Sequence, residues 1–107
     1  MTVTRNFRET ILDRVRGDRA FRRELLREGV EALVSGDLDT AKALLRDYIK
    51  STMGYAQLAK ATSIPEKSLL RMFGPSGNPQ ARNLLQVIAH LQKAEGLSLQ
   101  VRSRKAA

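Results

Sequence analysis

The chain has 107 residues, 42% of them hydrophobic, and a formal net charge of +8, so its length fits one ordinary domain with a single core. It contains no cysteine, which excludes disulfides, thiolate metal sites and a cysteine nucleophile and fits a reducing compartment. No apolar run approaches the roughly 20 residues that span a bilayer, and charges interrupt the apolar positions at the N-terminus. We therefore expect a soluble cytoplasmic protein with no membrane contact and no signal peptide.

The positive charge is concentrated in the second half of the chain. Residues 1–47 carry ten Lys or Arg against nine Asp or Glu, a net charge of +1, whereas residues 48–107 carry nine against two, a net charge of +7. A basic segment in an otherwise balanced chain indicates where an acidic partner such as a nucleic acid would bind.

Two amphipathic helices are predicted before residue 37. Phe7, Ile11 and Val15 recur at helical spacing and form the apolar stripe of the first helix. Asp18 can cap the start of the second helix, and Gly36 is a natural terminator for it.

The second helix carries arginine and glutamate on its polar face. A basic helix can contact RNA or a membrane surface, but here glutamates interleave with the arginines. We interpret this face as solvated and held by ion pairs within the helix. Its charged residues include Arg19, Arg22, Arg23, Glu24, Arg27, Glu28 and Glu31.

Four further helices are predicted. Asp37 and Asp39 place hydrogen-bond acceptors and negative charge at the start of a third helix, which we expect to run to about Met53. Gly-Pro-Ser-Gly-Asn-Pro, residues 74–79, separates the last two helices. After the third helix, the expected helices are Tyr55 to about Thr62, Pro65 to about Phe73, and Gln80 or Ala81 to about Ala94.

The end of the chain shows the only strand signal. Leu97, Leu99 and Val101 alternate with polar residues, a period of two that predicts a short strand. A lone strand leaves its backbone donors and acceptors unpaired, so we interpret this segment as an association element. Residues 102–107 form a basic tail that we expect to be unstructured.

Residues 55–73 meet most requirements of a helix-turn-helix. Ala59 is the small residue that lets two helices cross closely, and Ile64 fills the turn between them. Pro65 favours a helix start because it lacks the N–H that a helix start leaves unbonded, and it forces Ile64 into an extended conformation. Periodicity alone favours a plain helical bundle over residues 55–94, whereas the combined spacing favours DNA binding.

Over about residues 41–97 the chain resembles the lambda-repressor-like (Xre) helix-turn-helix family. The resemblance rests on the run LAKATSIPEKSL at residues 58–69 and on Gly77-Asn78-Pro79. Within that family the chain is most similar to the antidote (antitoxin) proteins of chromosomal addiction modules, whose loop and following Leu-Leu pair appear here as Gly77-Asn78-Pro79 and Leu84-Leu85. The family's turn usually has glycine where this chain has Ser63, and a side chain in a left-handed turn costs roughly 1 kcal/mol relative to glycine.

The resemblance implies that the second helix of the motif lies in the major groove and reads bases. By this resemblance, Glu66, Lys67 and Arg71 occupy the family's base-reading positions. Their chemistry suits that role, because arginine can pair bidentately with guanine and glutamate can accept a hydrogen bond from cytosine. Ser68 and Leu70 complete the exposed face, and Leu70 can touch a thymine methyl group. The alternatives are a merely solvated helix face for Lys67 and Arg71 and a core position for Leu70.

Phosphate contacts are expected on either side of that helix. Tyr55 and Gln57 lie at the start of the first helix of the motif, whose backbone amides favour anions. Ser76, Asn78 and Arg82 lie in and after the loop that follows the second helix. The alternative for Asn78 is a capping role at the last helix.

The residues assemble no catalytic, metal or cofactor site. His90 is the single histidine, and it lies among apolar residues of the last helix. The sequence Gly-Pro-Ser-Gly at residues 74–77 lacks the Lys-Ser/Thr ending of a nucleotide-binding loop. We therefore expect a protein that is not an enzyme and has no cofactor.

The expected fold is all-α, with about six helices, a lambda-repressor-like helix-turn-helix core and a short C-terminal strand. We expect a helical pair at residues 1–36 packed on the DNA-binding core at residues 37–101, in one compact domain, followed by the tail at residues 102–107. The expected core residues are Ile11, Leu25, Leu33, Leu45, Leu58, Ala59, Leu69, Leu84, Ile88 and Leu91.

The expected function is sequence-specific binding of double-stranded operator DNA by a homodimer, on an inverted repeat with half-sites about one helical turn apart. The resemblance further implies an antitoxin-like repressor of its own operon, with a small toxin protein as partner. The alternative is a protein-interaction antidote that binds a partner toxin without reading DNA. Ser63 in the turn and Glu66 on a face that would meet phosphate favour this alternative.

Overall fold

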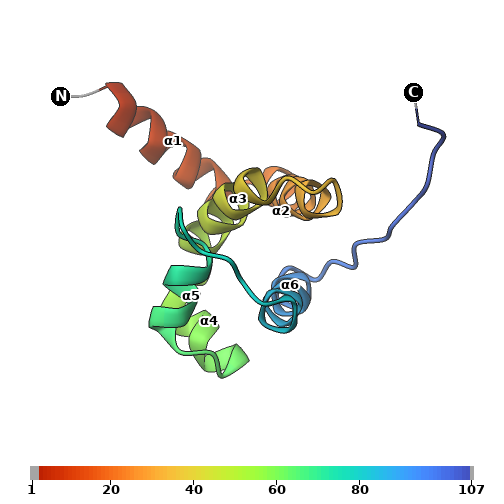
Figure 1. The fold of residues 1–107 in the computed structure, drawn as a ribbon. Helices are drawn as coiled ribbons and strands as arrows, with labels where there is room; N and C mark the ends of the chain where they lie inside the picture. The colour runs from red at the N-terminus through yellow and green to blue at the C-terminus, as the bar shows by residue number, and fades with distance from the viewer. Residues whose placement is uncertain (1–2, 107) are drawn as a thin grey trace.

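The computed structural model describes residues 3–106, with side chains from residue 9 on, and in this part of the chain shows six α-helices and no strand (Figure 1). This confirms the all-α prediction, and the helix ends lie within one or two residues of those predicted for the last four helices. The side chain of Phe7 lies outside the described side chains. The helices are α1 (Val3–Gly17), α2 (Arg19–Val34), α3 (Leu38–Ser51), α4 (Gly54–Thr62), α5 (Glu66–Met72) and α6 (Ala81–Glu95).

Short sequence signals explain where the helices begin and end. The carboxylate of Asp18 accepts a hydrogen bond from the backbone N–H three residues later at 3.0 Å, and Asp37 does the same for α3 at 3.2 Å. Gly36 follows α2 with φ +86°, and the N–H groups of Gly36 and Asp37 close the helix by donating to carbonyls of its last turn. The capping roles predicted for these residues are confirmed.

Helix α3 is the centre of the core. Leu45, Tyr48 and Ile49 are fully or almost fully buried, and α3 packs against α1, α2 and α4. Helix α6 covers the other side of α4 and contributes Val87 and Leu91 to the same cluster. This arrangement leaves α4 and α5 together at one end of the molecule (Figure 1).

The predicted core is correct for half of its members. Leu45, Leu58, Leu69, Ile88 and Leu91 are buried. The other five, Ile11, Leu25, Leu33, Ala59 and Leu84, are only partly buried. The buried face of α2 is centred on Leu26 rather than Leu25, because α2 turns that face toward α3. The large residues Tyr48 and Phe73 were not on the predicted list and are almost completely buried.

The predicted C-terminal strand is wrong for the single chain. Residues 97–106 have no regular secondary structure, and the segment extends away from the helices toward the C-terminus (Figure 1). Leu97 and Leu99 pack on the core, and the Leu99 N–H donates to the side-chain oxygen of Gln92 at 2.8 Å. The alternation therefore reflects an extended segment with one face against the helices, and no second strand lies beside it to form a ladder.

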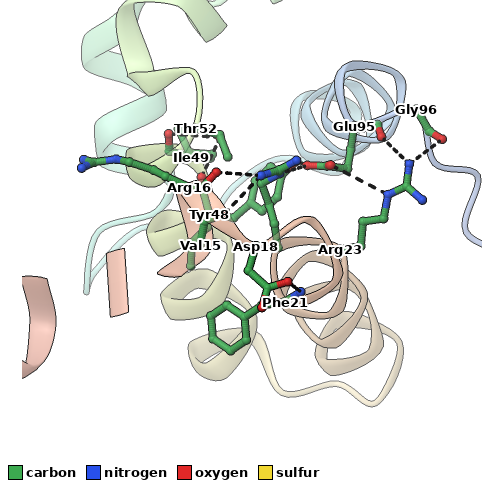
Figure 2. A network of polar contacts seen from close by, with 11 residues as sticks. Val15, Arg16, Asp18, Phe21, Arg23, Tyr48, Ile49, Thr52, Glu95 and Gly96 are labelled. Carbon is green, nitrogen blue, oxygen red and sulfur yellow. Dashed lines mark hydrogen bonds and ion pairs between the residues drawn. The ribbon is translucent and has the colours of Figure 1, made fainter. Parts of the chain in front are cut away.

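A buried polar cluster, here called the Glu95 cluster, joins α2, α3 and α6 (Figure 2). Glu95, whose side chain is only 5% exposed, accepts hydrogen bonds from Arg22 Nε at 2.7 Å and from the Tyr48 hydroxyl. Arg23 donates to the backbone carbonyls of Glu95 and Gly96, at the end of α6. The Glu95 cluster fixes the end of α6 against the first half of the chain.

This cluster corrects part of the prediction for the arginine face of α2. Arg27 does pair within its helix, with Glu24 and Glu31. Arg22 and Arg23 do not, because α6 places a carboxylate and its terminal carbonyls beside them. Intrahelical spacing alone could not reveal that partner.

No helix within residues 3–106 is long and apolar enough to cross a membrane. The side chains described there contain no group of three or more acidic residues or histidines arranged to hold a metal ion.

Candidate nucleic-acid interface

Helices α4 and α5 are joined by a tight three-residue turn at residues 63–65. Ser63 adopts the left-handed conformation with φ 60° and ψ 22°, the only positive φ among the described non-glycine residues, and its N–H donates to the carbonyl of Ala59 at 2.9 Å. The expected left-handed turn is therefore present without the glycine that usually forms it. The Thr62 hydroxyl accepts the N–H of Ile64, and Gln86 of α6 donates to the Thr62 carbonyl at 2.9 Å.

Helix α5 has one buried and one exposed face, as its sequence predicts. Leu69, Met72 and Phe73, the residue that ends the helix, are buried. Leu70 is 48% exposed, which excludes the alternative that it is a core residue. The exposed or half-exposed face carries all the residues proposed for base contact, namely Glu66, Lys67, Ser68, Leu70 and Arg71.

The residues proposed for phosphate contact differ in accessibility. Gln57, Ser76, Asn78 and Arg82 are exposed. The side chain of Tyr55 is buried, with its ring 6.4 Å from that of Phe73, and burial raises the pKa of its hydroxyl to about 12. The ring of Tyr55 is therefore part of the core, and its backbone remains for contact with a phosphate.

A shallow hollow of about 190 Å³ lies between α5 and the start of α6. It brings Ser68 and Arg71 of the predicted base-reading set together with Asn78 of the predicted phosphate set. Gln80, not Asn78, is the residue before α6, and no side chain caps that helix start. The capping alternative for Asn78 is therefore wrong, and its side chain is free for another partner.

The cations of this face form no ion pair with the described residues. The ion pairs between described side chains use cations from residues 14–42. Lys67, Arg71 and Arg82 form none, and the same holds for the other lysines and arginines after residue 48 in the described part of the chain. The lysines and arginines that give the second half its net charge of +7 are therefore not neutralised by ion pairs with the described residues, and they can attract an acidic partner.

Two cations of α3 hold the loop that follows α5, and sequence reasoning missed both. The Lys42 ammonium group, in a residue only 5% exposed, donates to the carbonyls of Gly74, Pro75 and Gly77. Arg46 donates to the carbonyl of Phe73 at 3.1 Å. A signal was available, because Lys42 lies on the apolar side of α3 between Ala41 and Leu45, where a lysine requires acceptors.

A second surface lies between α2 and the C-terminal segment. It is a groove of about 440 Å³ whose apolar lining is Val30, Val34, Leu99 and Val101. Val34 and Val101 are among the few large hydrophobic residues that are strongly exposed. The groove is therefore a candidate contact surface.

Comparison of the chain with models of known protein families, with curated proteins and with solved structures found no match.

Proposed function

We propose that the protein binds double-stranded DNA sequence-specifically, with α5 in the major groove and α4 across it as the supporting helix. The observation that carries this proposal is the exposed face of α5. Its cations pair with none of the described residues, and it includes an exposed leucine. A tight turn and a buried opposite face fix its orientation. The resemblance to the Xre helix-turn-helix family supports the same assignment.

Each residue of the face has a proposed role. Arg71 pairs with guanine, Lys67 donates to a guanine or a phosphate, and Glu66 accepts from cytosine. Leu70 packs on a thymine methyl group. Gln57, Ser76, Asn78 and Arg82 contact phosphates on either side, together with the backbone at Tyr55.

The proposed active form is a homodimer on an inverted repeat. We assign the contact between copies to the groove beside Val34 and Val101. The apolar lining comes from both α2 and the C-terminal segment, so two copies can bury the exposed Val34 and Val101 against each other. Val101→Asp should leave the protein folded and monomeric in sedimentation equilibrium, whereas an unchanged dimer would place the contact elsewhere.

The proposed biological role is that of an antitoxin-like repressor of its own operon, with a small toxin as a further partner. This role rests on the family resemblance. It predicts that the DNA site lies upstream of the protein's own gene.

The experiment that tests DNA reading compares three alanine variants on two DNAs. One duplex is selected by the wild-type protein from a random pool, and the other has scrambled sequence. Arg71→Ala should weaken binding to the selected duplex by about 1–3 kcal/mol and change binding to the scrambled duplex little, because a base contact carries the discrimination. Arg82→Ala should weaken both alike, as expected for a phosphate contact.

Lys93→Ala is the matched control. It removes one positive charge from an exposed position at the opposite end of α6 from Arg82, and it should change neither affinity by more than about twofold. Equal losses on both duplexes for Arg71→Ala would restrict Arg71 to phosphate contact. Failure of the wild-type protein to select any duplex would favour the alternative role as a toxin-binding antidote that does not read DNA.

A further inference from the structure

The loop at residues 74–80 depends on one buried lysine of α3. The ammonium group of Lys42 has three N–H donors, and three backbone carbonyls of the loop accept from it. The distances are 2.9 Å to Gly74, 3.3 Å to Pro75 and 2.9 Å to Gly77. Asp39 lies 3.9 Å away and is almost fully exposed, so it compensates this charge little.

The loop has little freedom to adopt another shape. A Cβ atom at Gly77 would lie 2.0 Å from the carbonyl oxygen of Arg71 and 2.6 Å from that of Met72, so the backbone approaches α5 as closely as only glycine permits. The Gly77 N–H donates to the carbonyl of Gly74 at 3.0 Å. Arg46 fixes the start of the loop through the carbonyl of Phe73.

The carbonyl contacts determine where the neighbouring amides point. All described peptide bonds are trans, and in a trans peptide the C=O and the following N–H point in opposite directions. Since the carbonyls of Pro75 and Gly77 turn toward Lys42, the N–H groups of Ser76 and Asn78 turn away from it. Neither N–H donates to a backbone acceptor among the described residues, and both residues are exposed.

We infer that Lys42 is a positioning residue, which turns the main-chain N–H groups of Ser76 and Asn78 outward as a pair of donors for DNA phosphate. The inference rests on the proposed function and adds a specific donor pair to it. Backbone N–H groups that are open to solvent are common donors to DNA phosphate oxygens. The side chain that holds the pair in place never touches the DNA.

The test uses Lys42→Met, which keeps the length of the side chain and removes its donors. Its matched control is Lys50→Met, which removes the same charge from an exposed position of the same helix. Lys42→Met should weaken binding to selected and scrambled duplexes by about tenfold each, so that their ratio is unchanged. The slope of log affinity against log salt should change little, because uncharged N–H donors release no counterions from the DNA. Lys50→Met should stay within about twofold of wild type.

Two further measurements separate positioning from a purely structural role. In the wild-type protein, the backbone amide resonances of Ser76 and Asn78 should shift when the selected duplex is added, and in folded Lys42→Met they should not. In Lys50→Met both amide resonances should shift as they do in the wild-type protein.

The outcomes distinguish this inference from the proposed function. If the wild-type protein binds no duplex, the proposed function fails. If it binds, but the Ser76 and Asn78 amides do not move or Lys42→Met binds with unchanged affinity, the positioning role is overturned and DNA binding stands.

Discussion

The two ends of α6 use arginine in opposite ways. At its C-terminal end, Arg22 and Arg23 are partly buried and bound to Glu95 or to the terminal carbonyls. At its N-terminal end, Arg82 and the nearby Arg71 of α5 are exposed and have no ion-pair partner among the described residues. The first pair of guanidinium groups is part of the fold, and the second pair is available to a ligand. Net charge becomes a functional signal only after this distinction is made.

The pKa shifts of Glu95 and Tyr48 support a structural role for the arginines at the C-terminal end of α6. Burial raises the pKa of the Glu95 carboxyl, but hydrogen bonds from Arg22 and Tyr48 and the two guanidinium charges outweigh it and leave that pKa below its usual value. Burial, followed by the hydrogen bond with Glu95, raises the pKa of the Tyr48 hydroxyl. Glu95 is therefore ionised and Tyr48 is neutral at neutral pH.

The largest expected effect is at the loop beside the DNA-binding face. Gly77→Ala should destabilise the protein by about 3 kcal/mol, because its Cβ would meet the backbone carbonyls of α5, which cannot move independently. Gly74→Ala is the control, since its Cβ would meet carbonyls no closer than 3.4 Å. Urea denaturation measures both variants. A similar small change for the two would show that the loop is not held as tightly as the distances indicate.

Glu95→Gln tests the other end of α6. It should destabilise the protein by about 2 kcal/mol near neutral pH, because a buried hydrogen-bonded charge is lost and Arg22 keeps no anionic partner. The affinity of the folded variant for the selected duplex should stay within about twofold of wild type. Loss of DNA binding in a fully folded variant would show that the C-terminal end of α6 also takes part in DNA binding.

The stability difference between wild type and Glu95→Gln should change with pH in a defined direction. A carboxyl group whose folded pKa lies below the usual value of 4.5 stabilises the fold above that pH, and the stabilisation is lost as the pH falls through the folded pKa. The stability difference between wild type and Glu95→Gln should therefore be complete near neutral pH and shrink in acid. Denaturation curves measured from about pH 7 to pH 3 check this. A constant difference over that range would assign the effect to packing.

Ser63→Gly should give a smaller effect of opposite sign. Glycine reaches the left-handed conformation of residue 63 without the penalty of a Cβ, so the variant should be more stable by about 0.5–1 kcal/mol. Ser35→Gly is the control, because Ser35 has φ −76° and its hydroxyl bonds the Glu31 carbonyl. Thermal unfolding of both variants measures the difference. Stabilisation by Ser35→Gly as well would point to a general effect of glycine.

The smallest effect on stability is expected for Arg71→Ala. Arg71 is exposed and has no hydrogen-bond or ion-pair partner among the described residues, so its removal should change the free energy of unfolding by less than about 0.5 kcal/mol. The same variant should lose discrimination between DNAs, as proposed above. Marked destabilisation by Arg71→Ala would mean that this arginine belongs to the fold, as Arg22 does.

The parts of the fold that follow from local signals were predictable from the sequence. Asp18 and Gly36 delimit α2, and Pro65 marks the start of α5. The two faces of α5 also followed from helical periodicity, because Leu69 and Met72, three positions apart, lie on one side of the helix. The exposed candidate residues were identified by the same argument.

The parts that depend on long-range contacts were not predictable. Arg22 meets Glu95 across 73 positions of the sequence, and Lys42 meets the loop across 32 to 35 positions. The strand signal at residues 97–101 failed for a related reason, because alternation describes an extended segment and cannot show whether another strand lies beside it. The burial of Tyr55 likewise depends on Phe73, which belongs to the next helix.

The salt dependence of binding to the selected duplex tests the central claim most directly. The claim is that the unpaired cations and backbone amides around α5 bind DNA phosphates. It predicts that log affinity falls linearly with log salt with a slope of about −3 or steeper, equivalent to about three or more phosphates, and that Arg27→Ala keeps this slope because Arg27 pairs within α2. A slope near zero, or no complex at low salt, would contradict it.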